Sequence, residues 1–109
     1  MLIAVASKDG KEINQHFGHA ERFLIYEVEG GNVVLVDEKK VERYCSYNPE
    51  HPLRGYLLKD IVASLAGCSA VVTAQMGEHP RAELELLGIE PFVVQGMIRP
   101  TLVEVAKLL

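Results

Sequence analysis

Hydrophobic residues in the first half of the chain form short runs typical of β-strands. Leu2–Ser7 is an apolar run of the kind buried on both faces of a sheet, and we expect it to be the central strand. Arg22–Glu29 and Val33–Val36 are rich in β-branched and aromatic residues, and the second run has room to extend to Val41. Gly30–Asn32 supplies positive φ angles between them, so this pair is predicted to form an antiparallel hairpin.

The second half of the chain alternates between helical spacing and apolar runs. Strand–helix–strand units of this length favour parallel pairing through right-handed crossovers. We therefore predict an α/β fold with a mixed five-stranded sheet flanked by helices, in the order β-β-β-α-β-α-β-α. The predicted elements here are a helix from Leu53 or Arg54 that stops at Gly67, a strand at Ser69–Ala74, a helix at Arg81–Leu87, a strand at Ile89–Val94 and a helix opened by Pro100.

Composition narrows the range of partners and compartments. With 109 residues, 49% of them hydrophobic, residues 1–109 are expected to form one domain. The net charge is −4 and the eleven Lys and Arg form no dense run, which argues against a nucleic acid partner. No apolar stretch approaches the roughly 20 residues that span a bilayer. We expect a cytoplasmic protein without a membrane partner, whose Cys45 and Cys68 are free thiols.

Two histidines follow the first predicted strand. His16 and His19 lie three residues apart, in the loop where ligands collect in open α/β sheets. Imidazole binds iron, zinc or copper, and thiolate binds iron-sulfur clusters, so His16, His19 and Cys45 together could form a metal site. The alternative is a loop whose histidines hydrogen-bond the backbone while Phe17 anchors it. Spacing alone favours this alternative, because paired histidines without further ligand spacing are a weak metal signal.

The other thiol and a third histidine have weaker claims to a role. Cys45 lies in a polar segment, where a thiol is accessible, whereas Cys68 follows a helix end and precedes a buried strand. Cys68 is therefore interpreted as a packed small residue. His51 could be a further ligand, but an exposed loop histidine without a role fits its position equally well.

A second candidate loop joins the strand at Ser69–Ala74 to the next helix. A helix N-terminus favours an anionic ligand, because its free N–H groups and dipole point outward. Met76 offers a thioether and His79 an imidazole, so both are candidate cofactor contacts. For each residue taken singly, a structural role is the favoured interpretation. Met76 is then a hydrophobic plug, and His79 is a neighbour of the helix cap.

Familiar enzyme motifs are absent from the sequence. It contains no G-x-x-x-x-G-K-[ST] phosphate loop, no G-x-S-x-G nucleophile elbow and no C-x-x-C pair. The first strand carries no carboxylate that could help to hold two catalytic cations. We therefore expect a protein that is not an enzyme.

Several segments resemble the dinitrogenase iron-molybdenum cofactor biosynthesis family, which includes NifX and the C-terminal domain of NifB. The resemblance covers essentially the whole chain and implies a ribonuclease H-like α/β fold. It also implies a non-catalytic carrier that binds an iron-sulfur precursor of the iron-molybdenum cofactor and passes it between donor and acceptor assembly proteins. The segments that carry it are Ile3–Ser7, Asn14–Ala20, Phe23–Tyr26, Tyr44-Cys45, Leu58–Leu65, Gly67-Cys68, Met76-Gly77 and Leu87–Ile89.

The resemblance also implies a set of contacts with the cargo. His16, His19 and Cys45 fall where the family has candidate cluster contacts, and the Met76-Gly77 turn lines the same end of the sheet. The implied cofactor is a transiently bound iron-sulfur cluster or cofactor precursor, carried by a monomer or weak homodimer. Three alternatives remain: a cluster carrier unrelated to nitrogenase, a regulatory or scaffolding domain that uses the hairpin edge without cargo, and an enzyme for a small phosphorylated or nucleotide substrate.

Overall fold

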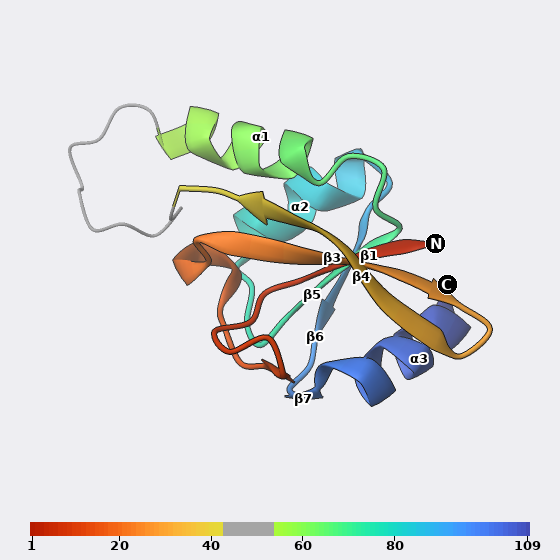
Figure 1. Ribbon diagram of the computed structural model, residues 1–109. Coiled ribbons are helices and arrows are strands. Elements are labelled where there is room, and N and C mark those ends of the chain that lie inside the picture. Colours follow the sequence, from red (N-terminus) through yellow and green to blue (C-terminus); the bar gives the residue numbers. More distant parts are fainter. Residues whose placement is uncertain (43–53) are drawn as a thin grey trace.

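A five-stranded mixed sheet separates two layers of helices (Figure 1). The structure is a computed structural model that describes residues 1–42 and 54–109. The sheet order is β4-β3-β1-β5-β6, and a separate ribbon pairs β2 with β7. The strands are β1 (Leu2–Val5), β2 (Glu12–Ile13), β3 (Arg22–Glu29), β4 (Asn32–Lys40), β5 (Ala70–Thr73), β6 (Glu90–Val93) and β7 (Gly96–Met97); the helices are α1 (Arg54–Ser64), α2 (Glu78–Leu86), α3 (Ile98–Leu108) and the 3-10 turn η1 (Phe17–His19).

The pairing of the strands confirms the predicted mixed sheet. β1 lies at its centre, antiparallel to β3 and parallel to β5. β5 and β6 are also parallel, whereas β3 and β4 form the predicted antiparallel hairpin. The sheet is therefore divided into a parallel half (β1, β5 and β6) and an antiparallel hairpin (β3 and β4).

Successive residues of each inner strand point to opposite faces and build two cores. Ala4 and Val71 belong to the core beneath α1 and α2, together with Phe17, Leu65 and Leu84. The opposite core lies against α3 and contains these residues: Ile3, Val5, Ile13, Leu24, Tyr26, Val28, Val33, Ala70, Val72, Ile98, Leu102 and Val105. Figure 1 shows α1 and α2 on one side of the sheet and α3 on the other. This arrangement explains why the inner strands have apolar residues on both faces.

Several predicted boundaries were wrong by one to three residues, and α3 begins at Ile98 rather than at Pro100. β1 ends at Val5, because the Ser7 hydroxyl accepts a hydrogen bond from the Gly10 N–H (2.9 Å) and so closes a turn. α2 begins at Glu78, three residues before the predicted start. Pro80 still lies in the first helical turn, where backbone N–H groups need no partner within the helix.

The ribbon of β2 and β7 was not predicted. Each strand has only two residues, which is too short to show a hydrophobic period. Ile13 is nevertheless buried against α3, and the Ile98 N–H donates to the Lys11 carbonyl (2.9 Å). The ribbon therefore ties the start of α3 to the segment that follows β1.

The hairpin contains an irregularity that leaves apolar residues in solvent. Ile25 pairs with Asp37 and Tyr26 with Leu35, so Val36 is an extra residue in a β-bulge. Val34, Leu35 and Val36 are 54%, 50% and 54% exposed. The outer strand therefore presents three consecutive apolar side chains to solvent.

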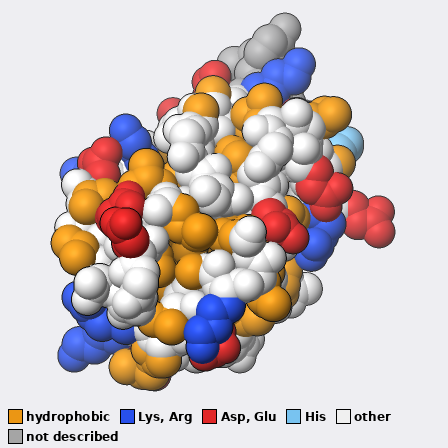
Figure 2. Space-filling view, turned by 90° about the vertical axis from the view of Figure 1, so that its right-hand side faces the viewer, with side chains coloured by type: hydrophobic (Ala, Val, Ile, Leu, Met, Phe, Trp, Pro, Cys, Tyr) orange, Lys and Arg blue, Asp and Glu red, His pale blue; other side chains and the backbone are white. Residues whose placement is uncertain are grey.

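The end of the molecule where both chain termini and the hairpin turn lie has a mixed surface (Figure 2). Hydrophobic side chains alternate there with acidic and basic ones, and no single sign of charge dominates. Among the described residues, no helix is long and apolar enough to span a bilayer.

Candidate functional site

The loop that carries His16 and His19 is hydrogen-bonded to the end of β5. The Ala74 N–H donates to the Gln15 carbonyl, and the Phe17 N–H donates to the Gln75 carbonyl, each at 2.9 Å. His16 and Gln75 thereby form a parallel bridge that continues the sheet beyond its named strands. The loop thus lies at the carboxyl ends of two parallel strands, where the sequence placed it.

A buried aromatic ring anchors this loop. Phe17 is 1% exposed and belongs to the core beneath α1 and α2. Its ring centre lies 5.4 Å from that of Phe23 on β3, a distance typical of a packed aromatic pair. The predicted anchoring role of Phe17 is confirmed.

The two imidazoles lie side by side on the short η1 turn. The ring centres of His16 and His19 are 5.2 Å apart and the rings are inclined by only 10°. The His19 N–H donates to the His16 carbonyl (3.1 Å), and the Gln15 side-chain amide donates to the His19 carbonyl (3.2 Å). Both side chains are exposed, and their ring nitrogens have no hydrogen-bond partner among the described residues. The turn is therefore held by its backbone, and the imidazole nitrogens remain open to a ligand.

The residues of the second candidate loop have different environments. Met76 follows Gln75 directly and is half-buried against the core beneath α1 and α2, in agreement with a hydrophobic plug. His79 lies inside the first turn of α2 and is exposed, so it is not a residue preceding the helix. The N-cap residue Gly77 provides no side-chain hydrogen bond to this helix end. The backbone joins this loop to the histidine turn through Gln75.

Of the two cysteines and His51, the structure describes only Cys68. Cys45 and His51 lie outside the described residues. Cys68 is 8% exposed in the core beneath α1 and α2, and burial raises the pKa of its thiol. This environment agrees with a packed residue. Among residues 1–42 and 54–109, no group of three or more His, Cys, Asp or Glu side chains is placed to hold a metal ion.

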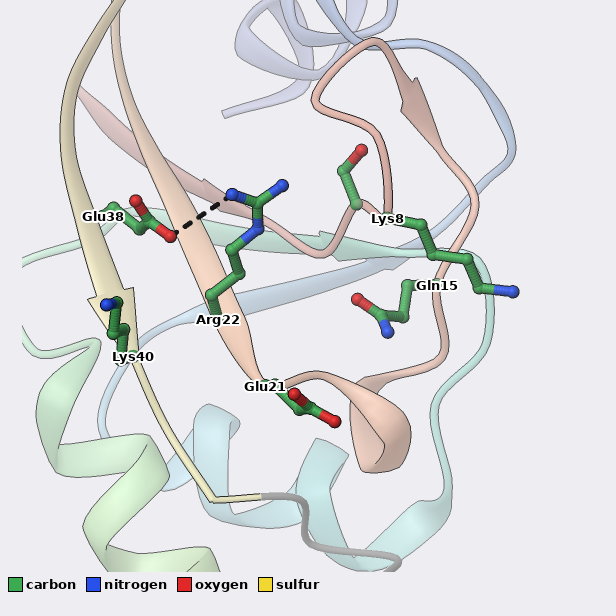
Figure 3. Close-up of a pocket in the computed structure, with 7 residues that line it drawn as sticks. Lys8, Gln15, Glu21, Arg22, Glu38 and Lys40 are labelled. Atoms are coloured by element: carbon green, nitrogen blue, oxygen red, sulfur yellow. Dashed lines mark hydrogen bonds and ion pairs between the residues drawn. The ribbon is translucent and has the colours of Figure 1, made fainter.

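A polar hollow adjoins the histidine turn and was missed by sequence reasoning (Figure 3). It has a volume of about 530 Å³ and shares Gln15 with that turn. Arg22 extends from β3 toward Glu38 on β4, where Nη1 and Oε1 are 3.3 Å apart, and both side chains are more than a third exposed. The full lining is Ser7, Lys8, Gln15, Glu21, Arg22, Glu38 and Lys40. These residues come from three chain segments, and only the register of the hairpin could have indicated that Arg22, Glu38 and Lys40 converge.

Side-chain oxygens order the segment that leads from β1 to the histidines. The Asp9 carboxylate accepts hydrogen bonds from the N–H groups of Lys11 (2.9 Å) and Glu12 (3.1 Å). These bonds hold the pKa of Asp9 below its usual range. The Asn14 side chain accepts a further bond from the Lys8 N–H (2.8 Å), which fixes the backbone at the rim of the polar hollow.

The model of one protein family matches almost the entire chain. That family is described as dinitrogenase iron-molybdenum cofactor, and the match covers residues 1–108.

The curated relatives are longer proteins. The FeMo cofactor biosynthesis protein NifB of Azotobacter vinelandii is 38% identical over 91 residues, which cover 84% of this chain and 18% of NifB. NifB of Frankia alni is 37% identical over 109 residues, which cover the whole chain and 21% of that protein. The chain thus spans about a fifth of the length of these relatives.

Solved structures share the fold. The crystal structure of PH0822 is 25% identical and superposes with a TM-score of 0.67, covering 98% of this chain and 91% of that one. The NMR structure of a Thermotoga protein of the DUF35 family, described as a NifB candidate, is 18% identical with a TM-score of 0.60. That match covers 97% of this chain and 87% of the Thermotoga chain.

Proposed function

Because the chain belongs to the dinitrogenase iron-molybdenum cofactor family, we propose that it is a non-catalytic carrier of an iron-sulfur precursor of that cofactor. It receives the precursor from one assembly protein and passes it to another. The observation that carries this proposal is the exposed, stacked pair of His16 and His19 at the carboxyl ends of β1 and β5. Relatives named as FeMo cofactor biosynthesis proteins support the cargo class.

Ligation by a small number of imidazoles suits a carrier. Neutral imidazole binds iron, and two such ligands leave most positions of a cluster free for other donors. Cys45, proposed from the sequence, would add a thiolate to His16 and His19. A cluster held by so few ligands can be released to an acceptor that offers more of them. Met76 and His79 are proposed as neighbouring cofactor contacts, because Gln75 joins their segment to the histidine turn.

The surroundings of the histidines also suit an anionic cargo. Three cationic side chains, Lys8, Arg22 and Lys40, line the adjoining hollow with two acidic ones. The free N–H groups at the start of α2 follow Gln75 by three residues and favour negative charge. Both features lower the electrostatic cost of holding a cluster that carries sulfide ligands.

We further propose a ribonuclease H-like classification for the fold. The order β4-β3-β1-β5-β6, with an antiparallel hairpin on one side of the central strand and two parallel strands on the other, supports it. We also propose that the protein works in the cytoplasm as a monomer or weak homodimer. The activity of full-length NifB is not part of this proposal, since the chain matches only about a fifth of it.

The decisive experiment is an anaerobic titration of the purified protein with an isolated iron-sulfur cofactor precursor. Iron would be counted after gel filtration, and visible absorption would be recorded on the same fractions. We expect co-eluting iron, and a loss of more than about tenfold in affinity when His16→Ala and His19→Ala are combined, because both imidazole ligands are removed. Unchanged retention of iron by this double variant would contradict the site.

Two further variants rank the proposed contacts. His79→Ala removes a neighbouring contact in the first turn of α2 rather than a proposed iron ligand, and should reduce retention far less than the double variant. Cys45→Ser tests the thiolate ligand on its own. Thermal unfolding of the histidine variants should match that of the parent protein, since exposed side chains contribute little to stability.

The same titration distinguishes the alternatives. Equal affinity for a simple [4Fe–4S] cluster and for the cofactor precursor would indicate a general cluster carrier. A protein that retains no iron but still binds assembly proteins would be a scaffolding domain. Turnover of a small phosphorylated substrate without a cluster would indicate an enzyme.

A further inference from the structure

An apolar hollow of about 480 Å³ opens on the α3 side of the sheet, the face opposite the core that anchors the histidine turn. Its apolar wall is formed by Tyr26 on β3, Leu35 on β4, and Met97 and Pro100 at the start of α3. Leu35 and Met97 are 50% and 51% exposed, although both are large apolar side chains. The hollow therefore keeps apolar surface in water beside an outer strand.

The outer strand next to this hollow has backbone groups that point away from the sheet. The Val28 N–H donates to the Met1 carbonyl and so faces β1 rather than β4. Val33, opposite Val28, must then belong to a non-hydrogen-bonded pair, whose N–H and C=O point outward. Tyr26, two residues before Val28, also faces β1, so the N–H and C=O of Leu35 opposite it point outward as well. The Arg99 side chain takes the Val33 carbonyl, so β4 can accept a further strand through the Val33 N–H and the N–H and C=O of Leu35.

Charged side chains, one of the usual protections of an outer strand, are missing at this place. Charged residues, which blunt such edges, begin only at Asp37. The three preceding residues, Val34–Val36, are apolar and exposed. The open stretch of backbone therefore coincides with the apolar hollow.

The charged side chains that line the hollow are both cationic. They are Lys11 and Arg99, in a chain whose net charge is −4. The Arg99 guanidinium donates to the Val33 carbonyl, which fixes it at the rim next to the open strand. A partner that enters here meets apolar surface and positive charge together.

We propose that this surface binds an extended segment of a partner protein. In this segment an apolar residue at one position is followed by an acidic residue two positions later, so that both side chains lie on the same face of the strand. The segment adds a strand to β4 and hydrogen-bonds the Val33 N–H and the outward N–H and C=O of Leu35. An apolar side chain enters the hollow, and an acidic one on the same face of the added strand lies beside Lys11 and Arg99. This inference is independent of the cargo and concerns a different face of the molecule.

The test is an NMR titration of the ¹⁵N-labelled protein with two synthetic octapeptides. In one peptide, leucine and glutamate take turns at every second position, so that both lie on the same face of the extended chain. The other peptide carries lysine in place of each glutamate. We expect the acidic peptide to shift the backbone amide signals of Val33 and Leu35, and to bind at least about tenfold more tightly than the basic one. Equal binding of both peptides, or no shift at these two amides, would overturn the proposal.

Substitutions assign the site to its residues. Leu35→Glu should weaken binding of the acidic peptide by at least about tenfold, because it blocks the hollow and adds a like charge. Leu86→Glu, the matched change at a 78% exposed leucine on α2, should leave binding unchanged. Lys11→Gln should weaken binding up to about fivefold and reduce its dependence on salt.

A sedimentation experiment tests whether a second copy of the chain occupies this edge instead. Sedimentation of the protein without peptide should give the mass of a monomer at the NMR concentration. A dimer that Leu35→Glu dissociates would assign this edge to a second copy of the chain and overturn the peptide proposal.

Discussion

The inner parallel strands β1 and β5 and the outer hairpin strand β4 differ in how far the helices cover them. All four residues of β5 are buried, whereas Val33 is the one buried residue among the nine of β4. β1 and β5 can offer chemistry only where they end, and the histidine turn lies there. β4 instead offers side chains and backbone groups along its length. The two regions therefore suit the two proposed tasks, the first small-ligand binding and the second contact with a protein.

The largest effect should come from the buried anchor of the turn at the ends of β1 and β5. Phe17→Ala should lower the free energy of unfolding by about 3–5 kcal/mol, because it removes a ring that is 1% exposed and leaves a cavity. Val36→Ala, the control in the hairpin, should change it by less than about 0.5 kcal/mol, since this side chain is 54% exposed. Urea unfolding of both variants measures the difference. Similar losses in the free energy of unfolding at Phe17 and Val36 would refute the contrast between the enclosed strands and β4.

An intermediate effect is expected from two glycines with positive φ. Gly96, at the start of the ribbon strand β7, has φ of +143°, and an added Cβ would lie 3.2 Å from the Thr101 hydroxyl. Gly31 in the hairpin turn has φ of +88° with no atom within 4 Å of an added Cβ. Gly96→Ala should cost about 1–3 kcal/mol and Gly31→Ala about 1–2 kcal/mol, because both strain the backbone but only the first is also crowded. Thermal unfolding of the two variants tests this order, and a larger loss at Gly31 would reverse it.

The smallest effect concerns two carboxylates whose pKa values are lowered for partly different reasons. Backbone N–H groups of Lys11 and Glu12 are the main cause for Asp9. For Asp37, on the hairpin, the Glu38 N–H is the main cause, and the ammonium of Lys39 at 3.3 Å adds to it. Salt screens exposed charges but leaves backbone hydrogen bonds in place. A ¹³C NMR titration in 1 M salt should therefore raise the pKa of Asp37 toward the ordinary value and leave that of Asp9 nearly unchanged.

The sign of the accompanying stability change follows from the lowered pKa values. Each carboxylate stabilises the folded state fully above the ordinary aspartate pKa of about 3.9, and this stabilisation is lost as the pH falls through the lowered value. Asp9→Asn should therefore make stability less dependent on pH below about 4. If the free energy of unfolding of this variant falls below pH 4 as steeply as that of the parent protein, the role given to the Lys11 and Glu12 N–H groups is contradicted.

Patterns of hydrophobic residues were sufficient to predict the sheet but not its outer details. The runs at Leu2–Ser7 and Ser69–Ala74 predicted inner strands because helices cover both of their faces. β4 reaches Lys40, one residue short of the extension to Val41 that the sequence allowed, since an exposed strand can continue through charged residues. The bulge at Val36 has no signal in the period of the pattern, because it arises from the register with β3.

The candidate site could be predicted only where it depends on local sequence. The position of His16 and His19 followed from their place after the first strand, and Phe17 between them was correctly predicted as an anchor. The stacking of the rings depends on η1, a turn of three residues that no pattern indicated. The polar hollow was missed because Ser7 and Glu38 are brought together only by the fold.

The two hydrogen bonds that attach the histidine turn to the end of β5 have a thermodynamic consequence for the proposed cargo binding. They restrict the rotation of the Gln15–Phe17 backbone when the chain folds, so a ligand that arrives later need not restrict it again. Binding by a preorganised turn loses less conformational entropy than binding by a loop that must first become ordered. A small set of weak donors can then reach a useful affinity, while the enthalpy of each bond stays low enough for release.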